Sequence, residues 1–473
     1  MIKVKSNVYF GFRRLFNLLF VSSCLLSISA CAENNSLNVE DVRNSSEQLM
    51  KNNDFNNDEI DDGLSVAVYR QNKTITISGD GLSITVKGEI QFSADDKAII
   101  AMSDDAMFDF EFIDGQGVKH RVMIDSNKQI KSYFRDGEAA EVSNQPQLLA
   151  ELLPNVLKES AFMANTRVSA RFNQFGYEKL KAYVLSVNNE SAKGIYIQLM
   201  LGLMTPNAKQ WHFWLNVAKQ FGQQHNQAIV LQALALQMHE LDFGFDSPEF
   251  VLLSAQVKSL NDHYGFEVYS SYLVKMEYHY RTFAQLLKLV GSDHYQFELL
   301  MILLNTEKSL LEQDIHDLVR LFDSEHYKAE VYLNAMNSTW FNSDTVIEAM
   351  LALSSDHYRV ELLKHFVRHR FDNVDFDKLG NAISYVQSDH YKFEILSYLL
   401  NSDEYESQAK GLILEQLPIM GSEHYQAQLI ANILEAEFLT KSHISALKES
   451  IFRLNNNQLK QMLNTRMTKL EKS

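Results

Sequence analysis

Apolar residues recur at helical spacing through most of the chain after residue 144, in units that share one phrase. The phrase is Ser or Asn, then Asp or Glu, then His, then Tyr, and its clear copies begin at residues 261, 292, 324, 355, 388 and 422. Degenerate copies occupy residues 189–192 and 223–226. Units that repeat every 31–38 residues predict an α-solenoid. The third column holds the candidate structural histidines His263, His294, His326, His357, His390 and His424.

The columns of the phrase predict a helix start. Ser or Asn at position one is expected to cap the helix, and the acid at position two to meet the helix dipole. Tyr at position four, as in Tyr295, heads an apolar stripe that continues at Leu299 and Leu303 and is expected to face the core. A second helix precedes each phrase, with an apolar stripe such as Ile315, Leu318 and Phe322.

Two antiparallel helices per unit predict a mainly α protein, a HEAT-like solenoid of about eight hairpins over residues 144–440. Residues 441–473 are polar and lack the phrase, so we expect capping helices there. Strict alternation at 74–78, 83–87 and 108–112, separated by Gly-Asp-rich turns, predicts a preceding domain of six to eight short antiparallel strands over residues 63–143.

The first residues predict export. Residues 1–30 hold four cations and no acid, followed by an apolar run, which is typical of a signal peptide. The segment Ile28-Ser29-Ala30-Cys31 resembles the lipobox of bacterial lipoproteins. This resemblance implies cleavage before Cys31, lipid attachment to it and, with Ala32 next, an outer-membrane protein facing the periplasm of a Gram-negative bacterium. The alternative is a plain secretory signal.

Residues 31–62 are rich in Asn, Asp, Glu and Ser and predict a flexible acidic linker after the lipidated cysteine. Asp54, Asn56 and Asp58 have the spacing of a calcium loop, but the loop's glycine and terminal glutamate are replaced, which favours the linker interpretation. We expect no bound metal and no cofactor. We also expect the lipid to be the protein's only attachment to the membrane.

The phrase in residues 388–396, Ser-Asp-His-Tyr-Lys-Phe-Glu-Ile-Leu, is similar to the Ser-Asp-Tyr-Asp-Lys-x-x-Val-Leu helical repeats of a family of uncharacterised bacterial envelope proteins. Some of those repeats are attached to antirepressor-type metallopeptidases. Residues 175–180 and 88–92 resemble that family's pre-repeat helix and β segment. The resemblance covers most of residues 63–435 and implies an architecture without an agreed activity. This chain has His and Tyr where the family has Tyr and Asp.

The net charge and the two cysteines limit the kinds of partner and the cross-links that this protein can have. The 473 residues carry a net charge of −16, which argues against nucleic acid and against a basic grip on anionic lipid. Cleavage at Cys31 would remove four cations and bring the charge to −20, which favours a partner with a basic surface. Cys24 would leave with the signal and Cys31 would be acylated, so the mature protein would have no disulfide.

Catalytic motifs are not evident in the sequence. His239-Glu240 has Phe243 where a zinc peptidase needs its second histidine. The histidine column has Glu four residues later in five copies, as in His294 and Glu298, which places both on one helix face. Hydrogen-bonded pairs are favoured over a row of divalent-metal half-sites, because neighbouring repeats lie about 10 Å apart. Trp211 and Trp214 are expected to be buried, the alternative being an exposed patch.

We expect a non-catalytic binding or scaffold protein for another envelope protein, acting through its solenoid. The alternative is an enzyme with an unrecognised site, an envelope-polymer hydrolase or a metal-dependent enzyme.

Overall fold

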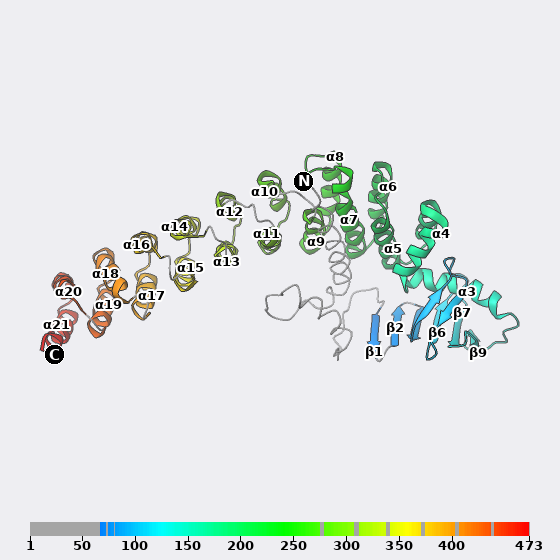
Figure 1. The fold of residues 1–473 in the computed structure, drawn as a ribbon, viewed down its shortest axis with the longest axis horizontal. Coiled ribbons are helices and arrows are strands. Elements are labelled where there is room, and N and C mark those ends of the chain that lie inside the picture. The colour runs from blue at the N-terminus through cyan, green and yellow to red at the C-terminus, as the bar shows by residue number, and fades with distance from the viewer. Residues whose placement is uncertain are drawn as a thin grey trace, which may run out of the picture. The chain divides into compact units, whose positions relative to one another are not determined.

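The computed structural model describes residues 67–71, 74–79, 81–274, 279–306, 312–336, 341–369, 374–402, 406–436 and 439–472. They form an antiparallel β region followed by stacked helices (Figure 1). The mainly α solenoid with a small preceding β domain is therefore confirmed. No helix within these ranges is long and apolar enough to cross a bilayer.

The β region has one sheet of seven strands in the order β1-β2-β3-β6-β7-β8-β9 and a separate β4-β5 hairpin. All pairs are antiparallel. The strands are β1 (Ala67–Gln71), β2 (Thr74–Gly79), β3 (Leu82–Lys87), β4 (Ile90–Phe92), β5 (Ile99–Met102), β6 (Met107–Ile113), β7 (Lys119–Asp125), β8 (Ile130–Arg135) and β9 (Glu138–Ala139). The described residues thus hold nine strands, more than the six to eight predicted, because β4 and β9 are too short to show alternation.

Alternation along the strands places one apolar face against a helix. Ile84 on β3 pairs with Phe110 on β6, which pairs with Val122 on β7, and all three side chains are buried. Helix α3 (Gln145–Ser160) covers this face with an apolar stripe that includes Leu153 and Val156. The β region therefore has a core of its own.

The helices that follow α3 are arranged in pairs. Their bounds are α4 (Ala164–Leu185), α5 (Glu190–Leu203), α6 (Ala208–Ala218), α7 (Gln224–Met238), α8 (Pro248–Val257), α9 (Asp262–Leu273), α10 (Tyr280–Leu287), α11 (Asp293–Thr306), α12 (Glu312–Val319), α13 (Glu325–Ala335), α14 (Ser343–Ala352), α15 (Asp356–His369), α16 (Phe376–Ser384), α17 (Asp389–Leu400), α18 (Glu406–Gln416), α19 (Glu423–Glu435), α20 (Lys441–Arg453) and α21 (Asn457–Lys472). Two short 3₁₀ turns, His239–Leu241 and Leu417–Ile419, follow α7 and α18.

Each phrase begins the second helix of a pair, and these second helices stack in sequence from α5 through α7 and α9 to α21. We call them the second-helix layer. Helices α12, α14, α16, α18 and α20 stack likewise and belong to the first-helix layer. Figure 1 shows the two rows of helices side by side. Helices α20 and α21 continue both rows at the C-terminal end.

One continuous apolar core runs between the layers. The predicted stripe residues Ile315, Leu318 and Phe322 of the α12 unit are buried, as are Leu299 and Leu303 of α11. Trp211 and Trp214 are also fully buried. Because each stripe is covered by the neighbouring pair as well as by its own, stability depends on the stacking.

Candidate functional site

The histidine column lies at the exposed N-terminal ends of the second-layer helices. All six histidines of the clear copies are exposed, whereas the tyrosines that follow them are half-buried. The tyrosines pack against the edge of the core instead of entering it. The expectation that Tyr at position four faces the core is therefore only partly right, because these tyrosines contact the core but stay half-buried.

Histidine and tyrosine rings alternate along the layer. His294 lies 4.9 Å from Tyr295 of its own repeat and 5.9 Å from Tyr327 of the next, measured between ring centroids. His357 has the same relation to Tyr358 and Tyr391, at 5.1 and 6.1 Å. We call this row the histidine–tyrosine ladder, formed by His225, Tyr264, His263, Tyr295, His294, Tyr327, His326, Tyr358, His357, Tyr391, His390, Tyr425 and His424.

The ladder is a packing contact between repeats, and a hydrogen bond joins two of its rings near the C-terminal end. Tyr425 Oη lies 3.3 Å from Nδ1 of His390 in the preceding repeat. At the other end, desolvation lowers the pKa of His225, and the nearby charge of His263 lowers it further. Aromatic pairs of this kind stabilise by about 0.5–1.5 kcal/mol beyond their area burial.

The expected pairs of His with Glu at position seven form at one end only. His263 Nε2 lies 3.5 Å from Glu267 Oε1. The remaining imidazoles of the clear copies contact tyrosine rings in tilted or edge-on arrangements. Glu361 and Glu394 both pair with Lys364. The prediction of a hydrogen-bonded His–Glu pair in each repeat is therefore wrong for most copies, because the ring of the next Tyr holds the imidazole instead.

The glutamates at position seven form a second row beside the ladder, on the same helix face. Its members are Glu267, Glu298, Glu330, Glu361 and Glu394. The side chain of Glu361 is 49% exposed and that of Glu394 is 36% exposed. Burial raises the pKa of Glu267, although His263 and the amide of Gln232 favour its charged form. This row carries negative charge along the exposed side of the layer.

The acid at position two has a role that the sequence did not indicate. In every clear copy except the one with Asp262, and in the degenerate copy with Glu190, it accepts backbone N–H groups from the loop that begins the next repeat's second helix, about 32 residues later. Asp356 Oδ2 accepts from Gln387 at 3.0 Å and Ser388 at 2.7 Å, and Asp389 Oδ2 accepts from Ser422 at 2.6 Å. We call this the acid clamp, formed by Glu190, Asp293, Glu325, Asp356, Asp389 and Glu423.

The clamp also corrects the prediction for position one. Asn261 caps its helix as expected, since its side chain accepts from the Tyr264 N–H at 3.0 Å. Ser324, Ser388 and Ser422 make no side-chain cap bond. Their backbone N–H groups are fixed by the acid of the preceding repeat, so the backbone and not the hydroxyl carries the contact. The only sequence signal for the clamp was the presence of Asp or Glu at position two of every clear copy.

No protein-family model and no curated protein sequence matches this chain. The lipid-attachment candidate Cys31, the expected signal peptide and the expected linker lie outside the described residues. Within the described part of the chain, no group of three or more His, Cys, Asp and Glu side chains converges as metal ligands would.

Proposed function

We propose that this protein is a lipid-anchored binding module of the bacterial envelope that docks another envelope protein on the exposed side of its second-helix layer. The observation that carries the proposal is the pair of rows on that side: exposed imidazoles at position three and carboxylates at position seven, repeated from α9 to α17. Solenoids bind partners through such extended surfaces.

The charges available on this surface favour a basic partner. The acid clamp residues are occupied by backbone N–H groups and contribute little to recognition. Glu361 and Glu394 share Lys364, whereas Glu298 and Glu330 are half-buried and form no ion pair with the described residues. Rows of partly exposed carboxylates attract Lys and Arg side chains and increase the association rate at low salt. Attachment through Cys31 would keep the surface near the envelope and leave the solenoid to select the partner.

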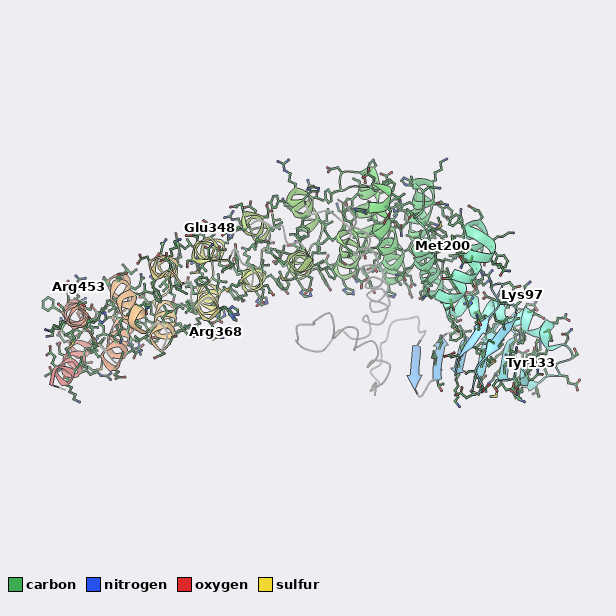
Figure 2. The ribbon with its side chains drawn as sticks, viewed as in Figure 1. Lys97, Tyr133, Met200, Glu348, Arg368 and Arg453 are labelled. Carbon is green, nitrogen blue, oxygen red and sulfur yellow. The ribbon has the colours of Figure 1, made fainter. Side chains whose placement is uncertain are left out.

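Site-specific photocrosslinking in living cells tests the proposal. A photoreactive amino acid at His326 or Glu330 of the second-helix layer should give a discrete adduct with one envelope protein. Matched controls at Leu351 of α14 and Asn381 of α16, both exposed on the first-helix layer, should not give it. Figure 2 marks the two sides of the α14–α15 pair by Glu348 and Arg368.

A charge series then tests the chemistry. The triple variant Glu298→Gln/Glu330→Gln/Glu394→Gln should lower the yield of the crosslinked adduct. It should also reduce the salt dependence of binding, because both effects arise from the same carboxylates. Equal adducts from both layers, or binding that is insensitive to salt and to these substitutions, would show that the proposed surface is not the docking site.

A further inference from the structure

Helix α15 carries a histidine pair that no neighbouring repeat has. His365 and His369 are four residues apart, the only two histidines in the chain with this spacing. Their ring centroids lie 4.1 Å apart and the ring planes make an angle of 27°. In the other clear copies the residue that corresponds to His365 is never a histidine; these residues are Ser271, Ile302, Asn334, Tyr398 and Asn432. A departure from the repeat pattern in a single unit points to a specific role there.

The two histidines differ in their exposure to solvent, and one of them has a ring nitrogen without a hydrogen bond. His369 is exposed, whereas His365 is half-buried and its Nδ1 is buried without a hydrogen-bond partner among the described residues. A buried polar atom without a partner normally costs about 1–3 kcal/mol, so its retention needs a reason. Glu361 lies one helical turn before His365 on the same face and its charge acts on that imidazole.

The cations beside the pair are engaged by other groups. Lys364 forms ion pairs with Glu361 and with Glu394 of α17. Arg368, which Figure 2 labels on α15, forms a hydrogen bond with Tyr398 of α17. Both cations therefore already have partners, among them Glu394 and Tyr398 of the neighbouring helix.

We propose that His365 and His369 together bind one divalent transition-metal ion of the copper, nickel and zinc class, which imidazole ligands prefer. Two histidines at positions i and i+4 of a helix are the spacing with which helical zinc sites present two ligands to one ion. Nitrogens bound to the same tetrahedral ion at ~2.0–2.1 Å lie about 3.3 Å apart, a separation that rings stacked at 4.1 Å reach by a side-chain rotation. Water molecules complete the ligand set, and the nearby Glu361 carboxylate adds negative charge without being a ligand.

This site is independent of the docking surface proposed above, since it uses positions eleven and fifteen of one repeat only.

Titration of the purified full chain with ZnCl₂, NiCl₂ or CuCl₂, followed by calorimetry, tests the proposal. The wild type should bind one equivalent, and His365→Ala or His369→Ala should each lower the affinity at least about tenfold. His424→Ala, which removes an exposed histidine that has no second histidine one turn away, should leave this binding unchanged. For Cu²⁺, the visible absorption band should shift toward nitrogen coordination in the wild type and not in the two pair variants.

Two further variants separate metal binding from packing. His365→Phe and His369→Phe preserve a stacked aromatic pair but remove the ligand nitrogens, and helical circular dichroism reports whether they fold. Folded Phe variants that lose the ion support the proposal. Wild type that binds no equivalent, or Phe variants that bind as tightly as wild type, would show that the pair is only a packing contact.

Discussion

Arg167 of α4 and Asp96 of the β4–β5 turn form a buried, two-pronged ion pair that ties the β region to the first helices. Arg167 Nε lies 2.8 Å from Asp96 Oδ1, and Nη2 lies 2.6 Å from Oδ2. Asp96 is fully buried with φ of 64°, and Arg167 is 5% exposed. Tyr183 Oη donates to Asp96 at 2.9 Å, so the carboxylate is satisfied from several sides.

Asp96→Asn should destabilise the junction strongly. Asn tolerates the left-handed backbone at this position, but it leaves the Arg167 charge buried without its counter-ion. Breaking one side of a buried ion pair costs about 3–5 kcal/mol. Urea unfolding followed by circular dichroism should show this loss, whereas Asp104→Asn in the next exposed turn should change the midpoint little. A loss below about 1 kcal/mol would mean that the hydrogen bonds to Arg167, and not its charge balance, hold the junction.

Removing one acid of the clamp should loosen the next repeat. In Asp389→Ala the Ser422 N–H loses its acceptor, which should cost about 1–3 kcal/mol. Hydrogen exchange should show faster exchange at the Ser422 amide and along α19, with α13 unaffected. Glu415→Ala, an exposed change on α18, is the matched control and should stay within about 0.5 kcal/mol. Equal exchange in both variants would show that the clamp does not link the repeats.

The clamp glutamates should make the C-terminal repeats sensitive to acid. Burial alone would raise the pKa of Glu325, but Lys328 and the N–H groups of Ser354 and Ser355 together hold it below its ordinary value. The N–H groups of Asn455 and Asn456 lower the pKa of Glu423.

Because these folded-state pKa values are depressed, the stability from both groups is present above the unfolded value near ~4.3 and is lost as pH falls through the folded value. The urea midpoint should therefore fall between about pH 5 and pH 3. Glu325→Gln should lower the midpoint at pH 7 and flatten the pH dependence, whereas Glu348→Gln on α14 should do neither. A wild-type midpoint that does not change across this range would contradict the linkage.

Cys31→Ser should abolish lipid attachment and release the protein from the membrane, since no described helix could replace the anchor. Metabolic labelling with an alkyne fatty acid, followed by fractionation of the envelope, measures both effects. Cys24→Ser, within the expected signal peptide, is the control and should leave labelling intact. A Cys31→Ser protein that stays in washed membranes would point to a second attachment.

The sequence by itself determined the repeat. The period, the helix starts and the buried stripes depend on contacts within one or two helical turns. The spacing of apolar residues and the recurrence of one phrase were therefore enough to place Leu299, Ile315 and their equivalents in the core. The three residues of β4 and the two of β9 were too few to carry a pattern. The histidine pair of α15 was visible as a spacing of four, but only the ring geometry showed its two rings in contact.

Only the tertiary structure decided which partner each polar residue has. The acid of position two meets a loop about 32 residues later, and His357 meets Tyr391 of the next repeat. Arg167 of α4 meets Asp96 of the β region. These contacts depend on the rise and rotation between stacked helices, which the whole packed core sets and no local pattern records. Sequence periodicity indicates which face of a helix is buried, whereas stacking decides which residue of the neighbouring repeat lies opposite that face.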